Sequence, residues 1–124
     1  GLYVDMASGL HVYRNIAYNN ASTGFMLAGV WRDGKLVYDN NIAANSLYGF
    51  RLSGVPYDTH GSVGTQVMNN IIVNNEAYGI LQSDADGIYD HIAIDYNLYD
   101  HNGWGSGMYK PGVMAIYRGS EPNE

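Results

Sequence analysis

The chain has 124 residues and no cysteine, which excludes disulfide frameworks, thiolate nucleophiles and cysteine-bound zinc. Its net charge is −6, from 12 acidic and 6 basic side chains, which argues against a surface that neutralises nucleic-acid phosphates. Glycine (16), asparagine (13) and tyrosine (12) are abundant, whereas charged residues make up only 15% of the chain. This composition favours short strands joined by tight turns over a helical protein.

A segment that begins with asparagine recurs four times along the chain. The copies start at Asn15, Asn41, Asn70 and Asn97, so that successive starts lie 26, 29 and 27 residues apart. An apolar residue stands three positions before each start, and a glycine stands eight or nine positions after it. The first three of these glycines open a short apolar run, and residues 1–4 have the same pattern. Because these classes of position keep step over four copies, the sequence is a tandem repeat.

Each repeat holds three short apolar runs separated by turn residues. None is long enough for a helix of ~10–12 residues, and the L-x-x-L-x-L core of leucine-rich repeats is missing. The pattern predicts an all-β fold, a parallel β-helix of about four to five coils whose equivalent residues stack ~4.8 Å apart. The predicted interior columns are Leu2, Phe25, Phe50 and Ile80; Val12, Tyr38, Val67 and Ile94; and Ile16, Ile42, Ile71 and Leu98.

The asparagines predict how the corners of this solenoid are built. Asparagine tolerates the left-handed backbone conformation, and its amide can bond to neighbouring groups at a sharp bend. In a stack, the four asparagines that start the repeats would run amide to amide and satisfy polar groups inside a dry solenoid. A second ladder is predicted from Asn19, Asn45 and Asn74, with His101 in the fourth place. Sugar binding is the functional alternative, but repetition in register favours the structural role.

Three segments resemble the V-x-x-N-[IL] element of right-handed parallel β-helix proteins in the pectate lyase-like superfamily. They are VYRNI at 12–16, VMNNI at 67–71 and IDYNL at 94–98, and the resemblance spans residues 1 to about 105. It implies a right-handed, single-stranded solenoid that is associated with carbohydrate and is secreted or periplasmic. The N-terminus itself has no basic n-region or cleavage pattern, and no apolar run approaches the ~20 residues of a membrane span.

The two ends of the predicted solenoid lack an obvious cap. We expect residues 1–105 to form the coils, and residues 106–124 to add one or two strands and a polar tail. Open sheet edges invite pairing with other chains. We therefore expect a homo-oligomer, associated end to end or side to side, or a piece of a larger protein whose flanking segments cover the ends.

The long turns of the repeat hold most of the candidate chemistry. Long, irregular turns carry function more often than short ones, and here they follow the glycine-led strands at 28–35, 53–65 and 82–90. The glycine-led strands themselves predict outward positions for Tyr3, Met26, Arg51 and Leu81, one per coil. The resemblance implies polysaccharide or oligosaccharide binding along this face. The candidate substrate contacts are Trp31, Arg32, Tyr3 and Met26.

Catalysis next to a sugar carboxylate needs a group that neutralises the carboxylate and a base that removes the neighbouring proton. Arg51 with Tyr57 and His60 could supply such a set. The simpler interpretation is that Arg51 is a solvated residue paired with an aspartate and that His60 is an ordinary loop histidine. No catalytic motif of any one lyase family is intact in the sequence.

Calcium is the one cofactor that the sequence suggests, with Asp58, Asp84 and Asp86 as candidate ligands. Residues 84–87 read DADG, which fails the EF-hand pattern and also makes sense as a simple turn. The same aspartates could instead provide two carboxylates ~5–10 Å apart, as glycoside hydrolysis requires. The four histidines form no close-spaced ligand pair, so a transition-metal site is not expected.

Two classes of function stay open. The first is an enzyme domain that acts on a polysaccharide by proton abstraction or by hydrolysis. The second is a non-catalytic module that binds glycans or serves as a structural spacer and self-associates through its uncapped ends. The negative net charge disfavours polyuronate substrates unless calcium bridges the two. Neither nucleic acid nor a membrane is an expected partner.

Overall fold

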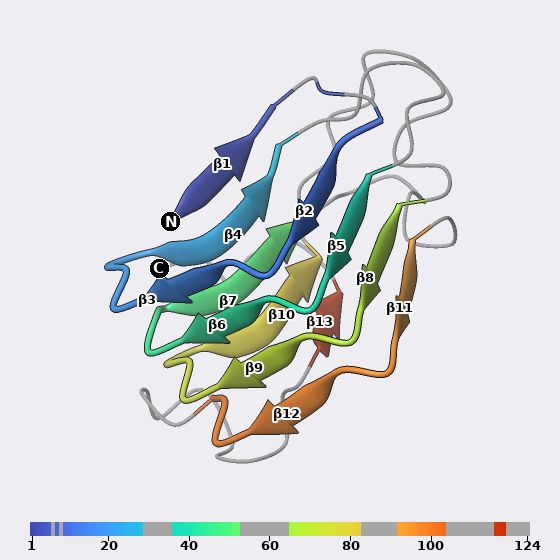
Figure 1. Ribbon diagram of the computed structural model, residues 1–124. Coiled ribbons are helices and arrows are strands. Elements are labelled where there is room, and N and C mark those ends of the chain that lie inside the picture. Colours follow the sequence, from blue (N-terminus) through green and yellow to red (C-terminus); the bar gives the residue numbers. More distant parts are fainter. Residues whose placement is uncertain are drawn as a thin grey trace.

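In the computed structural model the chain winds into a solenoid whose strands are all parallel to their neighbours (Figure 1). The structure describes residues 1–5, 7, 9–28, 36–52, 65–82, 92–103 and 116–118, and no helix occurs in these ranges. Each coil contributes one strand to each of three sheets, and a further strand extends the first sheet. The predicted all-β parallel β-helix of four to five coils is therefore confirmed.

The three sheets form the walls of the solenoid. The first sheet contains β1 (Leu2–Val4), β4 (Thr23–Leu27), β7 (Tyr48–Leu52), β10 (Tyr78–Gln82) and β13 (Ile116–Arg118). The second sheet contains β2 (His11–Tyr13), β5 (Val37–Asp39), β8 (Gln66–Met68) and β11 (Ala93–Asp95). The third sheet contains β3 (Ile16–Tyr18), β6 (Ile42–Ala44), β9 (Ile71–Val73) and β12 (Leu98–Asp100). Strands that are adjacent in a sheet come from successive coils, as the repeat predicts.

Two of the three predicted apolar columns line the interior. In the first sheet Phe25 pairs with Phe50, and Phe50 pairs with Ile80, all at 1% exposure or less. The rings of Phe25 and Phe50 stack with centroids 4.9 Å apart. Leu2 keeps the register but is 40% exposed, because no described coil lies above it. In the second sheet the predicted column also points inward: Val12, Tyr38, Val67 and Ile94.

The third predicted column stacks in register but faces outward, so its prediction as core is wrong. Ile16 is 70% exposed, Ile71 41% and Leu98 54%, and Ile42 is half-buried. The interior instead receives the next residue of each strand: Ala17, Ala43, Ile72 and Tyr99. Each strand has three residues and follows an asparagine whose amide turns inward. Alternation then leaves only the middle residue of the strand pointing inward.

The first predicted asparagine ladder is confirmed. It runs along the corner between the second and third sheets, which we call the first corner. Asn41 shows the pattern: its Nδ2 donates to the Val12 carbonyl (2.9 Å) and to Asn70 Oδ1 (3.1 Å). Its Oδ1 accepts from the backbone N–H (3.0 Å) and the Nδ2 (3.2 Å) of Asn15. The two inner rungs, Asn41 and Asn70, therefore each tie their own coil to the coils above and below.

The second ladder exists, but it lies one residue later than predicted. At the second corner, between the third and first sheets, Asn75 donates to Asn102 Oδ1 (2.8 Å) and accepts from the Ser46 N–H (3.2 Å). The predicted rungs Asn19, Asn45, Asn74 and His101 instead adopt φ between 50° and 55°. That left-handed bend turns the chain, and the residue after it points back inside. The ladder residues are Asn20, Ser46, Asn75 and Asn102.

The glycine at the second position of β4 and of β7 is required by close contact between coils. A Cβ on Gly49 would lie 2.6 Å from the Gly79 carbonyl oxygen and 2.8 Å from Ile72 Cγ2. A Cβ on Gly24 would lie 2.7 Å from the carbonyl oxygen of Gly49. The glycine and the residue after it therefore both approach the interior, where a second side chain has no room.

Candidate functional site

The predicted outward column of the first sheet is in register, one residue per coil. Tyr3 pairs with Met26, Met26 with Arg51, and Arg51 with Leu81. The exposure of the column decreases along the stack: Tyr3 is 59% exposed, Met26 and Arg51 are half-buried, and Leu81 is fully buried. Tyr3, Met26 and Arg51 are therefore the solvent-accessible part of this face, which we call the outer face of the first sheet.

The buried end of that column belongs to a small apolar cluster outside the main core. Tyr48, Ala77, Tyr78 and Leu81 pack together, separately from the interior residues. The rings of Tyr48 and Tyr78 stack with centroids 6.1 Å apart, and Thr23 shares their register. These tyrosines therefore form a structural column, and their buried rings are not open to a ligand.

Most of the predicted site residues lie outside the described part of the chain, because the long turns do. Arg51, Tyr3 and Met26 are described, and the column brings these three together. The predicted residues that lie outside are Trp31, Arg32, Tyr57, Asp58, His60, Asp84 and Asp86. The catalytic set around Arg51 and the calcium ligands therefore stay predictions.

Sequence reasoning missed an ion-pair geometry on the second sheet. His11 Nε2 lies 2.6 Å from Asp39 Oδ1, and the imidazole contacts the ring of Tyr13 at a centroid distance of 4.7 Å. The partners are 28 residues apart, whereas the residue directly below His11 is Val37. The contact is therefore diagonal between coils. A search for pairs separated by one repeat plus two residues could have found it.

The described residues contain few groups that could do chemistry. No three His, Asp or Glu side chains in the described ranges converge in a way that could hold a metal ion. Burial raises the pKa of Tyr38, whose ring lies inside the solenoid near Phe50. Desolvation by burial also raises the pKa of Tyr99. Neither phenol is suited to act as a base at neutral pH.

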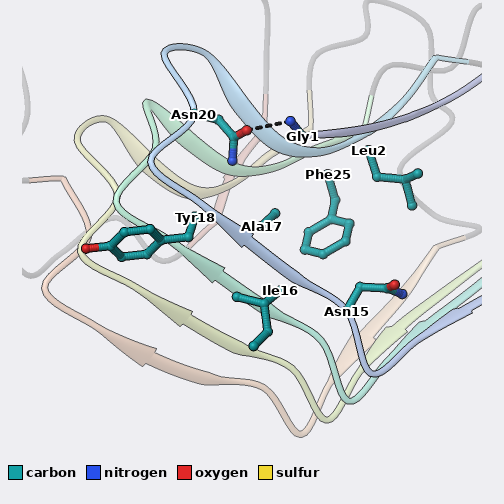
Figure 2. Close-up of a pocket in the computed structure, with 8 residues that line it drawn as sticks. All are labelled: Gly1, Leu2, Asn15, Ile16, Ala17, Tyr18, Asn20 and Phe25. Carbon is teal, nitrogen blue, oxygen red and sulfur yellow. Dashed lines mark hydrogen bonds between the residues drawn. The ribbon is translucent and has the colours of Figure 1, made fainter.

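A cavity of ≈330 Å³ opens at the N-terminal end of the stack (Figure 2). Asn15 and Asn20, the first rungs of the two ladders, line it together with Phe25 and neighbouring apolar residues. Ala17 points toward Phe25, and Asn20 Oδ1 accepts a hydrogen bond from the Gly1 amine (Figure 2). The described residues of this lining include no carboxylate, imidazole or basic side chain. The cavity is the open end of the core.

These features define the class of protein: a solenoid of stacked parallel coils with asparagine-lined corners. The family model for a right-handed β-helix region matches residues 1–97, most of the chain. The chain belongs to the right-handed β-helix family. A search of the curated proteins and a search of the solved structures each found no significant match. None of the described residues forms a helix long and apolar enough to cross a membrane.

Proposed function

We propose that this β-helix is a glycan-binding module whose ligand lies along the outer face of the first sheet. The observation that carries the proposal is the register of Tyr3, Met26 and Arg51, which repeats one outward side chain per coil on a parallel sheet. An elongated ligand can contact successive coils of such a face at once. In the sequence the long turns follow directly after these strands. Because long turns often carry function, this supports a ligand site on the same side of the molecule.

The three accessible side chains offer complementary contacts to an acidic sugar. The exposed ring of Tyr3 provides a large apolar surface with few rotatable bonds, on which a sugar face can stack. The Arg51 guanidinium can bind a carboxylate through two parallel hydrogen bonds. Met26 lies between them in the register and adapts its shape to the ligand. The ligand class proposed is therefore an oligosaccharide or polysaccharide that carries uronate groups.

The net charge of −6 opposes a polyanionic ligand, so we propose that calcium assists its binding. Asp58, Asp84 and Asp86 are the proposed ligands of the ion, since carboxylates on neighbouring coils supply the oxygen donors that calcium prefers. Such a module would work in the extracellular space or the periplasm, where polysaccharides occur. Chelation of calcium should then weaken the binding of uronates more than the binding of neutral sugars.

Proton abstraction from a bound uronate is the second candidate function. Arg51 favours it, because the residue lies on β7 next to the long turn that holds Tyr57 and His60. Arg51 would hold the carboxylate and make the neighbouring C–H more acidic, and Tyr57 or His60 would accept the proton. The electron pair of the C–H bond would form a C=C bond as the glycosidic C–O bond on the adjacent carbon breaks, and the leaving oxygen would take a proton from water. Incubation with polyuronates should then produce an unsaturated product, which is detected by its ultraviolet absorbance. Binding without this absorbance supports the module rather than the enzyme.

Calorimetric titration of the full chain with acidic and neutral oligosaccharides, with calcium and with a chelator, tests the proposal. We expect Tyr3→Ala and Arg51→Met each to weaken binding at least tenfold; the second keeps an apolar stem and removes the charge. Tyr13→Ala is the matched control, because Tyr13 is similarly exposed (53%) but lies on the second sheet. The proposal is contradicted if the chain binds neither acidic nor neutral oligosaccharides, or if Tyr3→Ala and Tyr13→Ala lose the same amount of binding affinity.

A further inference from the structure

The outer face of the third sheet carries an exposed aliphatic column. We call Ile16, Ile42, Ile71 and Leu98 the aliphatic stripe. They stack in register on β3, β6, β9 and β12. Tyr18, at the other outward position of β3, is 58% exposed as well. The stripe lies on the opposite side of the sheet from the core residues described above.

The second sheet shows that such a face is not a general feature of these coils. Its outward positions include His11, Asp39, Gln66 and Asp95, as a face in contact with water normally does. Residues 71–73 of the third sheet read Ile-Ile-Val and are therefore apolar on both sides. Continuous apolar strands are typical of parallel sheets that are covered on both faces. Asp100 on β12 is the one charged residue at the outward positions of these four strands, so most of the third sheet has the composition of a covered wall.

The layout and composition of this face match one side of a small dimer interface. Its four strands, ~4.8 Å apart, and the six residues from corner to corner, ~3.3 Å each, give a flat face of roughly 20 Å by 20 Å. The stripe forms an apolar centre, and the left-handed corner residues form a polar rim on either side. The flat area of such a face is about 400 Å², about half of the roughly 800 Å² that each partner buries in a standard complex, so the interface is a small one.

We propose that two copies of this chain pack face to face through their third sheets, related by a two-fold axis that runs parallel to the strands. This axis reverses the direction of one stack relative to the other. Ile16 of one copy then faces Leu98 of the other, and Ile42 faces Ile71. The aliphatic stripe is therefore self-complementary, as an isologous interface requires.

Charge selects this orientation over the parallel one. In the antiparallel arrangement the exposed Arg14 at the first corner faces Tyr96 and Asp95 of the other copy. A guanidinium is attracted both by an aromatic face and by a carboxylate. With the two-fold axis along the solenoid instead, Arg14 faces Asn19, and the acidic Asp95 and Asp100 of both copies gather at one end. Like charges placed this way disfavour the parallel dimer.

The mass of the full chain in solution, measured by light scattering over a concentration series, tests the proposal. We expect a particle of twice the 13.6 kDa chain mass. Ile71→Lys should shift the protein to the monomer and raise the dissociation constant of the dimer at least 30-fold, because it places a charge at the centre of the stripe. Met68→Lys is the matched control: Met68 is in the same coil and faces outward, but on the second sheet. Far-ultraviolet circular dichroism confirms that both variants are folded.

A charge exchange then tests the orientation. Arg14→Glu should weaken the dimer about tenfold, and adding Asp95→Arg in the same chain should restore it, because the two positions face each other across the antiparallel interface. A monomeric wild type overturns the proposal, whatever else covers the stripe. So does a dimer that Ile71→Lys and Met68→Lys affect equally. A double variant that shows no recovery overturns the antiparallel orientation. Glycan binding on the first sheet is measured separately, so its failure leaves these outcomes unchanged.

Discussion

The second and third sheets have the same architecture, but the apolar residue that the repeat marks is buried in the second sheet and exposed in the third. In both, each strand has three residues, and only the middle residue points inside. In the second sheet that middle residue is the apolar one that the repeat marks, such as Val67. In the third sheet the repeat marks Ile71, which is exposed, while Ile72 is buried. The comparison shows that the corner sets the face of the strand that follows it.

The corner between the two sheets is where the largest effect is expected. Asn70→Ala removes the donor to the Tyr38 carbonyl (3.1 Å) and the acceptor of the Asn41 N–H (2.9 Å), both inside the structure. Leaving several buried groups unpaired should lower the free energy of unfolding by about 4 kcal/mol. Urea denaturation followed by circular dichroism measures the loss.

The neighbouring residue provides the matched control for this corner. Asn69 has φ 57° and is exposed, so Asn69→Gly keeps the bend without strain and should change stability by less than about 1 kcal/mol. If the two substitutions cost the same, the inward amide is not what fixes the corner.

The first sheet sharpens the comparison, because there two successive residues approach the interior. In Gly49→Ala the new methyl group would press on the Gly79 carbonyl and on Ile72, so the coils must separate. We expect a loss of about 3 kcal/mol in the free energy of unfolding. Gly9→Ala is the control: its φ of 66° causes strain, but nothing lies within 4 Å of the added Cβ, so about 1 kcal/mol is expected. The thermal unfolding midpoints of the two variants should rank in this order.

The two interior tyrosines predict how stability depends on alkaline pH. Their pKa values in the folded chain are raised by burial, so above the ordinary tyrosine pKa of about 10 the unfolded chain loses protons first. The stabilising contribution is therefore complete below about pH 10 and is lost as the pH rises toward the folded pKa values. The thermal midpoint measured from pH 8 to 11.5 should stay level and then fall above about 10.

Tyr38→Phe separates the contribution of the second sheet from that of the third. The Tyr38 hydroxyl is buried without a hydrogen-bond partner among the described residues, so its removal should change stability at neutral pH by no more than about 1 kcal/mol. Above pH 10 the variant should lose less stability than the wild type. A wild-type midpoint that shows no alkaline fall, or an identical fall in the variant, would count against buried neutral phenols.

The sequence predicts the strand register of this fold more reliably than the direction of its side chains. Register follows from the spacing of Asn15, Asn41, Asn70 and Asn97, because equal winding places equivalent residues above one another. The direction of a side chain is predicted from the alternation of apolar and polar residues along a strand. A strand of three residues is too short to show which of the alternating positions point inside. The prediction of the second ladder was wrong by one residue for a similar reason: Asn19 and Asn20 are both asparagine, so the sequence does not show which of the two side chains points inside.

Of the candidate site, the sequence predicted the column of Tyr3, Met26 and Arg51 correctly, because that column follows from the repeat. It did not predict that Leu81 would be buried, since its outward position in the strand gave no sign of the surrounding cluster. Long turns break the repeat, so periodicity places no residue within them. The pair of His11 and Asp39 was missed because diagonal contacts between coils do not share a repeat position.

The most direct test of the account compares two adjacent isoleucines. Ile72 is fully buried and Ile71 is 41% exposed, although the repeat marks only Ile71. Under conditions where the chain is monomeric, Ile72→Ala should lower the free energy of unfolding by about 3 kcal/mol, and Ile71→Ala by less than about 1 kcal/mol. Equal losses, or a larger loss for Ile71→Ala, would contradict the inward and outward faces of the third sheet, on which the dimer proposal rests.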